Sequence, residues 1–242
     1  MSHGHWRQVR DLVRDLDQHC RSPIEILLIG NHPEDAELAS LRSSHTVSLQ
    51  MNSSPKGFAA NQNAAFDRSA GPFFCVLNPD VRLRDDPFPA LAGYIANPEI
   101  GLVAPLVVST NGTIQQSFRD VMSPWMLARR AVGLDRNSPF IAAPHVFPEW
   151  IAGMFMLFRR EVFAELQGFD ERYFLYCEDM ELCCRVWLSG RKVAIHGGAA
   201  VLHDGQYASR KSLKYLLLHL RSLLRFWRSR TYVEFRKRFR KH

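Results

Sequence analysis

The chain has 242 residues, 46% of them hydrophobic and 23% charged, with a formal net charge of +7. This composition is ordinary for a soluble globular protein, and the length allows one large α/β domain or two small ones. The five cysteines form an odd set without a CxxC pair, which favours reduced core thiols over disulfides. We find no signal peptide and no apolar run near the ~20 residues that span a bilayer, so we expect an intracellular protein.

The basic residues are concentrated at the C-terminal end. Residues 207–242 hold 12 of the 31 lysines and arginines and one acid, Glu234, for a charge of +11. Residues 1–206 hold the other 19 basic residues and 23 acidic ones, for a charge of −4. We therefore expect a domain over residues 1–206 and a basic tail over 207–242. Such asymmetry indicates an anionic partner for the tail, either a membrane or nucleic acid.

The first half of the chain alternates between helical and strand-like patterns. Trp6–His19 has apolar residues at helical spacing, and Gly57–Arg68 is typical of a helix opened by glycine. The remaining predictions are strands over Ile24–Ile29, Thr46–Met51, Phe73–Leu77 and Gly101–Val108, and helices near Ala36–Arg42 and over Phe88–Ile95. This order predicts an α/β fold with a mostly parallel, doubly wound sheet, whose site lies at the carboxyl ends of the strands.

The second half begins with Arg136–Glu149, which has three prolines and little periodicity and predicts a loop. The predictions that follow are a strand over Met154–Phe158, helices over Glu161–Leu166 and Glu178–Leu188, and strand-like segments over Val193–Ile195 and Ala199–Leu202.

From Ser212 onward the pattern is that of an amphipathic helix. One face carries Leu213, Leu216, Leu217, Leu220, Leu224 and Trp227, and another carries Lys214, Arg221, Arg225 and Arg228. We interpret this segment as an interfacial helix whose apolar face enters an anionic membrane surface while its arginines pair with lipid headgroups. A helix packed on the domain with a solvated basic end is the simpler alternative. Nucleic-acid binding is less favoured, since no recognised motif accompanies the basic stripe.

Acidic residues mark a candidate active site. Glu178-Asp179 stands between an aromatic run and an apolar helix pattern, and His203 ends a later strand-like segment. Upstream, the sequence Leu77-Asn78-Pro79-Asp80 ends another apolar run with a carboxylate. Together they suggest chemistry on a metal-bound, phosphate-bearing substrate. Helix N-terminal acids, a turn aspartate and a structural histidine are the simpler readings.

The order of these segments carries a resemblance to a known family. The sequences GFAANQNAAF, VLNPDV, WIAGMF, GFDERYFLYCEDMELCCR and VLHDG resemble the rhamnosyltransferase-like branch of family 2 glycosyltransferases. The likeness runs from roughly Ile24 to Trp227. It implies a GT-A fold, inversion at the anomeric carbon and a nucleotide-diphosphate-sugar donor, with rhamnose as the candidate sugar. It also implies a divalent cation, Mg²⁺ or Mn²⁺, and an acceptor hydroxyl on a glycan or lipid-linked precursor at the cytoplasmic membrane face.

The resemblance also implies roles for single residues. Asp80 would reach the metal on the donor diphosphate, His203 would complete the metal site and favour Mn²⁺ somewhat, and Asp179, beside Glu178, would be the general base. Trp150 and Gly153 would lie on the acceptor side. The residues implied on the donor side are Asn31, Asp35, Gly57, Asn61, Asn63, Asn78, Arg119 and Arg210.

Two features depart from the family pattern. The family normally has a hydrophobic strand before its first helix, whereas MSHGHW resembles the loop just after that strand. A misplaced start, a truncation, or a sheet without that interior strand, and hence with unpaired edges, would each account for this. The second departure is Gly30, where the family usually carries an acid. These departures leave a second hypothesis open, a non-catalytic, membrane-associated remnant of the fold that acts as a binding or scaffold partner.

Overall fold

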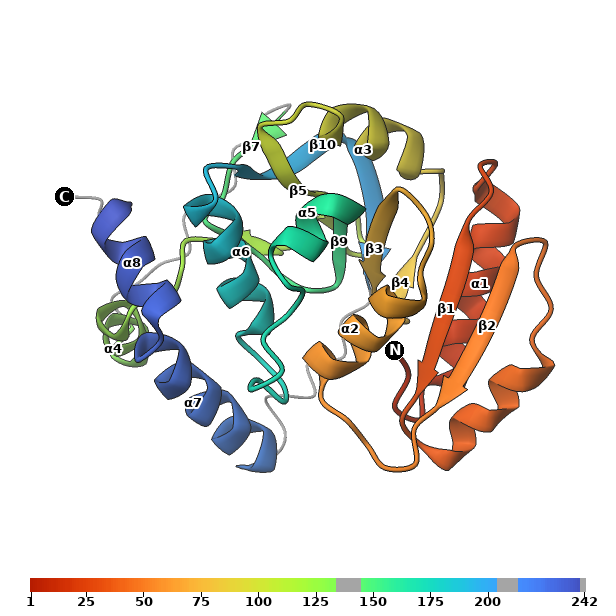
Figure 1. Cartoon of the computed structure of the whole chain (residues 1–242), viewed down its shortest axis with the longest axis horizontal. Coiled ribbons are helices and arrows are strands. Elements are labelled where there is room, and N and C mark those ends of the chain that lie inside the picture. The colour runs from red at the N-terminus through yellow and green to blue at the C-terminus, as the bar shows by residue number, and fades with distance from the viewer. Residues whose placement is uncertain (134–144, 204–212, 240–242) are drawn as a thin grey trace.

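A computed structural model describes residues 1–133, 145–203 and 213–239 (Figure 1). Its helices are α1 (Trp6–His19), the 3₁₀ helix η1 (Pro33–Ser40), α2 (Phe58–Arg68), α3 (Phe88–Ile95), α4 (Pro124–Ala131), α5 (Arg160–Glu165), α6 (Glu178–Leu188), α7 (Leu213–Trp227) and α8 (Arg230–Arg238). Its strands are β1 (Glu25–Gly30), β2 (Thr46–Met51), β3 (Phe73–Leu77), β4 (Val81–Arg82), β5 (Ile100–Val108), β6 (Phe118–Arg119), β7 (His145–Val146), β8 (Trp150–Ile151), β9 (Phe155–Arg159) and β10 (Lys192–His203).

The central sheet is mixed rather than mostly parallel, which corrects that part of the prediction. Its strand order is β3-β9-β5-β10-β4, and β7 also pairs with β10. β5 and β10 are parallel, but β9 runs antiparallel to both β3 and β5. The reason is that β9 begins beside the C-terminal end of β3, since Phe155 lies opposite Leu77. A strand parallel to β3 would need a crossover connection that carries the chain back to the start of β3.

Two pairs of strands stand apart from the central sheet. β1 and β2 form a parallel pair of their own, with Glu25 opposite Thr46 and Gly30 opposite Met51. In Figure 1 this pair lies beside β3, with α1 behind it. β6 and β8 form the second pair, which is short and antiparallel.

Strand β10 is irregular in its middle. The sequence predicted two separate strand-like segments in place of this one strand. It pairs with β5 as far as His196 opposite Pro105 and resumes at Ala200 opposite Leu106, so residues 197–199 bulge out. Proline has no N–H to donate to the ladder, so the pairing breaks at Pro105. Beyond the bulge, β10 pairs antiparallel with β4 and brings His203 opposite Val81.

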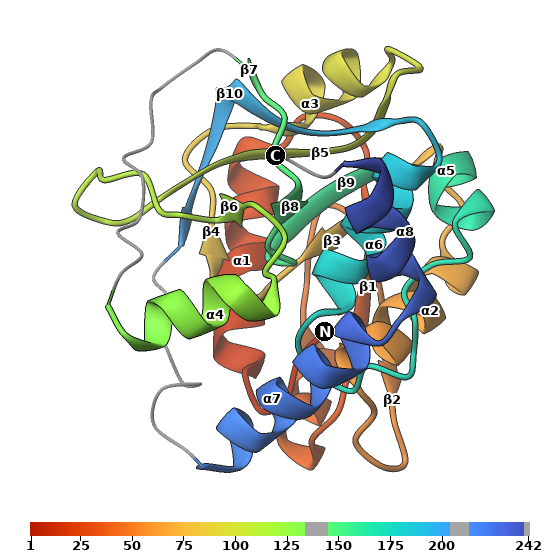
Figure 2. The same cartoon turned by 90° about the vertical axis from the view of Figure 1, so that its left-hand side faces the viewer.

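The helices cover both faces of the sheets. α1 and α3 contribute to one apolar cluster, while residues of α2, α5 and α6 pack in a second. A third cluster joins α6 to the C-terminal helices through Leu223, Phe226 and Phe235, and Figure 2 shows α8 lying over α6, with α7 below it. The basic tail thus shares core contacts with the preceding residues. No helix within the described ranges is long and apolar enough to cross a membrane.

Candidate active site

Asp80 and His203 lie next to each other at the C-terminal ends of β3 and β10. Asp80 directly precedes β4, whose first residue, Val81, pairs with His203. The Nε2 atom of His203 lies 3.2 Å from Oδ2 of Asp80, and the two side chains are 12% and 29% exposed. The pairing of β4 with β10 therefore brings together two predicted metal ligands that are far apart in the chain.

Gln115, which the sequence did not single out, fixes the imidazole of His203. Its Nε2 donates to the carbonyl oxygen of His203 at 2.6 Å, and its Oε1 lies 3.0 Å from Nδ1 of the same residue. Since that amide oxygen is an acceptor, Nδ1 carries a proton. In the neutral ring Nε2 then presents a lone pair towards the carboxylate of Asp80. Two acceptors that face each other at this distance suit a cation between them.

The electrostatics of Asp80 agree with a cation site. Desolvation acts to raise the pKa of Asp80, but a positive charge beside the carboxylate, which a protonated His203 supplies when it donates from Nε2, outweighs this and lowers the pKa. A cation held between Asp80 and the neutral ring would act in the same direction. Oδ1 of Asp80 is buried and has no hydrogen-bond partner among the described residues. The described ranges contain no group of three His, Cys, Asp or Glu side chains that could hold a metal ion. One carboxylate and one imidazole fit a metal whose other ligands come from a diphosphate and water.

Asp179 lies in the first turn of α6 and faces the segment before β9. Its Oδ2 accepts from the backbone N–H of Gly153 at 2.9 Å, and its Oδ1 accepts from that of Met180 at 2.7 Å. Burial raises the pKa of the Asp179 carboxyl, although these two N–H groups favour the charged form. The Trp150 indole also favours the charged form, although its N–H has no partner in hydrogen-bond geometry among the described residues.

Glu178 is the more buried member of the acid pair, at 5% exposure. Its Oε2 has no hydrogen-bond partner within the described part of the chain. Burial, together with the neighbouring charge of Asp179, raises the pKa of Glu178 well above its ordinary value. The Glu178 carboxyl is therefore harder to ionise than an ordinary glutamate, whereas the Asp80 carboxyl is easier to ionise than an ordinary aspartate.

The backbone before α6 has an unusual conformation. Tyr176 and Cys177 have φ values of 71° and 69°, in the left-handed region that residues other than glycine rarely adopt. Each such residue costs about 1–3 kcal/mol, and such strain is typical of functional sites. The left-handed turn sets the direction in which α6 starts and therefore the position of the Glu178-Asp179 pair.

One short segment links the two halves of the site. Gly153 donates its N–H to Asp179, and the carbonyl oxygen of the next residue, Met154, accepts from the N–H of Asn78 at 2.9 Å. Asn78 in turn lies two residues before Asp80. Asp80, Asp179 and His203, which the sequence predicted would converge, are thus connected at one edge of the sheet through the residues that lead into β9.

Asparagines organise the loop between β2 and α2. Nδ2 of Asn52 donates to Oδ1 of both Asn31 and Asn61, at 2.8 and 2.7 Å. Asn31 also accepts from the N–H of Lys56 and donates to its carbonyl oxygen. Asn31 and Asn61 are buried, so these bonds hold the loop directly rather than leaving both amides open to a ligand. Asn52 and Lys56 were not predicted as site residues.

Asp35 is fully buried and binds the N-terminal segment. Its carboxylate accepts from the hydroxyl of Ser2 at 2.5 Å and from the N–H groups of Asn31 and His32 at 3.1 and 3.0 Å. The N–H of Gly4 also points at this carboxylate. The Asp35 side chain therefore fixes the backbone at the end of β1 through hydrogen bonds inside the protein. A direct contact between Asp35 and a nucleotide stays a prediction.

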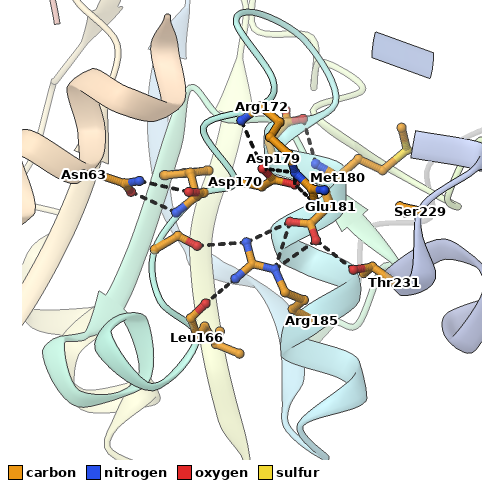
Figure 3. A network of polar contacts seen from close by, with 12 residues as sticks. Asn63, Leu166, Asp170, Arg172, Asp179, Met180, Glu181, Arg185, Ser229 and Thr231 are labelled. Atoms are coloured by element: carbon orange, nitrogen blue, oxygen red, sulfur yellow. Dashed lines mark hydrogen bonds and ion pairs between the residues drawn. The ribbon is translucent and has the colours of Figure 1, made fainter. Parts of the chain in front are cut away.

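Gly57 and Asn63 position the segment that precedes α6. A Cβ atom on Gly57 would lie only 2.6 Å from the carbonyl oxygen of Phe174, so the two backbones touch at this point. Oδ1 and Nδ2 of Asn63 pair with the N–H and carbonyl groups of Phe169, both at 2.9 Å (Figure 3). Contact of either residue with a donor is likewise still a prediction.

The remaining predicted residues lie near Trp150 or outside the described ranges. Arg119 on β6 pairs with Trp150 on β8, so a predicted donor-side residue and a predicted acceptor-side residue are neighbours. Arg210 lies outside the described residues.

A buried ion-pair network anchors α6 (Figure 3). Glu181, 3% exposed, accepts from the guanidinium of Arg185 at 2.7 Å and from the hydroxyl of Thr231 on α8 at 2.8 Å. Arg185 also donates to the carbonyl oxygens of Leu166 and Gly168. The helix that carries Asp179 is therefore tied on one side to the C-terminal helices and on the other to the turn before Phe169.

A family model described as glycosyl transferase family 2 matches residues 3–166. The chain belongs to glycosyl transferase family 2. It is 24% identical over 249 residues to the rhamnosyltransferase WbbL of Escherichia coli K12, covering 93% of this chain and 90% of that protein. It is 28% identical over 166 residues to an N-acetylglucosaminyl-diphospho-decaprenol L-rhamnosyltransferase of Mycobacterium tuberculosis, covering 61% of this chain and 52% of that enzyme.

Solved structures agree on the fold of this family 2 glycosyltransferase. GalNAc-T7 with UDP, GalNAc and Mn²⁺ matches with a TM-score of 0.67 at 16% identity, over 93% of this chain and 46% of that one. A Pyrobaculum calidifontis mannosyltransferase with GDP-Man and Mn²⁺ matches with a TM-score of 0.62 at 13% identity, over 93% and 62%. The expected GT-A fold is confirmed, and so is the resemblance to the rhamnosyltransferase-like branch.

Proposed function

We propose that this glycosyltransferase moves a sugar, with rhamnose as the candidate, from a nucleotide-diphosphate donor to a hydroxyl of a glycan or lipid-linked precursor, with inversion. The observation that carries the proposal is the connection of Asp80, His203 and Asp179 through Gly153 and Met154 at one edge of the sheet. The named activities of the two rhamnosyltransferases support the choice of sugar.

Asp179 would act as the general base. Its carboxylate uses two acceptor positions for the N–H groups of Gly153 and Met180, which fix its orientation. A carboxylate has about four lone-pair sites, so it can still accept the proton of an acceptor hydroxyl. The raised pKa of Asp179 makes it a better proton acceptor than an ordinary aspartate. Trp150, next to Arg119, would form a wall on the acceptor side.

Asp80 and His203 would hold the divalent cation. Bound to the donor diphosphate, that ion supplies neutralisation of the charge that develops on the leaving group. The oxygen and imidazole ligands suit Mn²⁺ or Mg²⁺. Gln115 would keep Nε2 of His203 available as the ligand atom. The loop that Asn31, Asn52 and Asn61 hold would frame the donor.

We further propose that the enzyme works at the cytoplasmic face of a membrane. Five leucines of α7 are 40–72% exposed: Leu213, Leu216, Leu217, Leu220 and Leu224. Arg221, Arg225 and Arg228 line a hollow together with three of these leucines. The helix is held to the protein by Leu223 and Phe226, which leaves its leucine face available for a headgroup layer beside a lipid-linked acceptor.

The deciding experiment compares Asp179→Asn with the unchanged enzyme in donor hydrolysis and in transfer, with Mn²⁺ and a nucleotide-diphosphate rhamnose. Loss of a general base lowers the rate by about 10²–10⁴-fold. In the unchanged enzyme, activity falls as the pH drops through a pKa above the ordinary ~4 of aspartate, because only the ionised base accepts a proton.

Asp67→Asn, at an exposed position of α2, is the matched control and keeps full activity. An active Asp179→Asn enzyme would refute the proposed base. The second candidate is a non-catalytic binding partner. It is motivated by the amide and carboxylate groups on the predicted donor side, because these groups already form hydrogen bonds within the protein. Calorimetry separates the two, since the remnant does not bind the donor in the presence of Mn²⁺ and the enzyme does.

A further inference from the structure

Helix α7 contacts the turn that leads into α6. Oγ of Ser222, a residue that is 7% exposed, donates to the carbonyl oxygen of Leu175 at 2.8 Å. The imidazole of His219 stacks on the ring of Tyr176, with the two centroids 4.8 Å apart and an angle of 27° between the planes. Cys177 is buried in the apolar cluster that α6 shares with α7. α7 therefore contacts the residues that come directly before the acid pair.

These contacts act on a strained backbone. Tyr176 and Cys177 keep their left-handed conformations only while the surrounding structure holds them there. Burial lowers the pKa of His219, so its ring is uncharged at pH 7 and stays packed against Tyr176. Without this ring and the hydroxyl of Ser222, the turn would be freer to adopt ordinary conformations, and Asp179 would lose its fixed direction.

α7 also forms a hollow of about 630 Å³ with the segment before this turn. The hollow is lined by Arg172, Arg221, Arg225 and Arg228 together with three exposed leucines of α7, and no carboxylate of the described residues lines it. Guanidinium groups bind phosphate through paired N–H groups. Four of them beside an apolar surface suit the phosphate headgroup of a lipid more than a free anion, because the lipid chains can follow the leucines.

Arg172 makes the hollow a link between two parts of the chain. It lies four residues before Tyr176, whereas the other three arginines lie on α7 or directly after it. Its ion pair with Asp170 engages Nε and Nη2, so Nη1 can donate to a phosphate. A ligand shifts a conformation only by binding one state better than another. A phosphate that contacts Arg172 and α7 together binds best while α7 is docked on the turn.

We propose that this hollow is a site for the phosphate headgroup of a membrane lipid, and that its occupation fixes α7, through His219 and Ser222, against the turn that positions Asp179. His219 and Ser222 are positioning residues, since they contact the turn and not the reacting groups. The enzyme then reaches its full rate only at an anionic lipid surface. The effect on the rate rests on the proposed function, in which Asp179 is the base, whereas the effect on the turn does not.

The test uses the full chain with Mn²⁺ and a nucleotide-diphosphate rhamnose, and adds phosphatidylglycerol vesicles, phosphatidylcholine vesicles or inorganic phosphate. Phosphatidylglycerol is expected to raise the kcat of donor hydrolysis at least about fivefold, the lower range of coupling between two sites, and to leave the KM of the donor unchanged. Hydrogen exchange of the amides of residues 175–179 is expected to slow by a similar factor. Phosphatidylcholine and inorganic phosphate should produce neither change.

Substitutions separate lipid binding from its effect on the turn. His219→Ala and Ser222→Ala each remove one contact with the turn, so both should lose the response while still sedimenting with the vesicles. His219→Phe keeps an aromatic ring against Tyr176 and should restore the response. Arg172→Gln should lose it, because the headgroup no longer links the two segments. Arg10→Gln, at an exposed position of α1, is the matched control and should respond like the unchanged enzyme.

Binding of phosphatidylglycerol vesicles with no change in exchange or in kcat would overturn the proposal. An equal response in His219→Ala and the unchanged enzyme would also overturn it, as would an equal response to inorganic phosphate or to an oligonucleotide. Slower exchange of the turn with phosphatidylglycerol, but no donor hydrolysis under any condition, would support the lipid site and refute the proposed function alone. The two failures are therefore distinguishable.

Discussion

The imidazole of His203 is held in place by a residue that belongs to none of the sequence motifs. Gln115 contacts His203 twice, through its backbone carbonyl and through Nδ1, and so fixes both the position and the tautomer of the ring. Residues that orient a ligand in this way affect a metal nearly as strongly as the ligand itself. Gln115 is a positioning residue, since it touches neither Asp80 nor the proposed cation.

Gln115→Leu should raise the Mn²⁺ concentration needed for half-maximal activity by about 10–100-fold, because the ring loses its orienting partner. Direct measurement of Mn²⁺ binding by paramagnetic resonance provides a readout that does not depend on turnover. Gln116→Leu, at the exposed neighbouring position, serves as the control and should leave the metal affinity unchanged. Equal affinity in the two variants would contradict the role of Gln115.

The sequence predicted Asp80, Asp179 and His203 but not Gln115, for a physical reason. The three residues follow or precede elements with clear apolar patterns. Gln115 lies after the turn at Gly112 and returns beside Val107 through a backbone hydrogen bond of 2.8 Å. Only the folded path of that turn brings its amide to His203, and no periodicity in the chain encodes it. The same holds for Asn52, whose neighbours Asn31 and Asn61 were predicted.

At the scale of elements, α6 depends on a buried charge pair. Glu181 is 4% exposed at its side chain and Arg185 is 21% exposed, and Thr231 completes the partners of the carboxylate. Removing one member of a buried pair leaves a charge without compensation, which costs more than the pair itself contributes. The anchoring of α6 to α8 is therefore sensitive to a single substitution.

Arg185→Met should lower the free energy of unfolding by about 3–5 kcal/mol, measured by urea denaturation. The matched control is Arg191→Met, which removes an arginine of similar exposure (24%) whose partner Glu165 is 53% exposed. That surface pair should contribute no more than about 1 kcal/mol. Similar losses in the two variants would show that burial of Glu181 is not what makes the network important.

Most element boundaries were predictable because local pattern decides them. Trp6–His19, Phe73–Leu77 and Glu178–Leu188 match the structure residue for residue. The segment near Ala36–Arg42 is instead the 3₁₀ helix η1, capped by His32 and Asp35. The direction of β9 was not predictable, since pairing depends on the edge at which the chain enters the sheet. The two segments expected within β10 are one strand, because β5 continues to pair beyond the bulge.

At the scale of the whole molecule, charge and exposed apolar surface coincide on α7. The unchanged enzyme should bind vesicles rich in phosphatidylglycerol and bind pure phosphatidylcholine vesicles far more weakly. Replacing Arg221, Arg225 and Arg228 with glutamine removes three charges at roughly 1 kcal/mol each, so binding should weaken by about 100-fold. Sedimentation with vesicles at several salt concentrations measures the effect.

Arg7, Arg10 and Arg14 provide a matched control, because they are three exposed arginines on α1. Their joint replacement by glutamine removes the same charge and should leave vesicle binding unchanged. Equal weakening would indicate that net charge, and not α7, draws the protein to the lipid. Binding to an oligonucleotide in preference to vesicles would favour the nucleic-acid alternative.

The apolar pattern of the tail predicted a helix but did not decide which of its side chains would pack on the protein. Leucines and Trp227 were expected on one helical face, but Trp227 donates to the carbonyl oxygen of Met122 and packs on the protein. The leucines, in contrast, remain exposed because Leu223 and Phe226 on another face make the contact. The helix therefore both packs on the domain and presents an apolar face, a combination that the sequence posed as alternatives.

The bulge at residues 197–199 constrains the length of this chain as well as its composition. Side chains of a strand alternate between the two faces of the sheet, so His203 reaches Asp80 only with the present spacing after Pro105. Losing or gaining one residue there would point the imidazole to the opposite face without altering a single ligand. Among homologues, insertions and deletions at this place should therefore come in twos, because the length of this segment decides whether His203 faces the candidate active site.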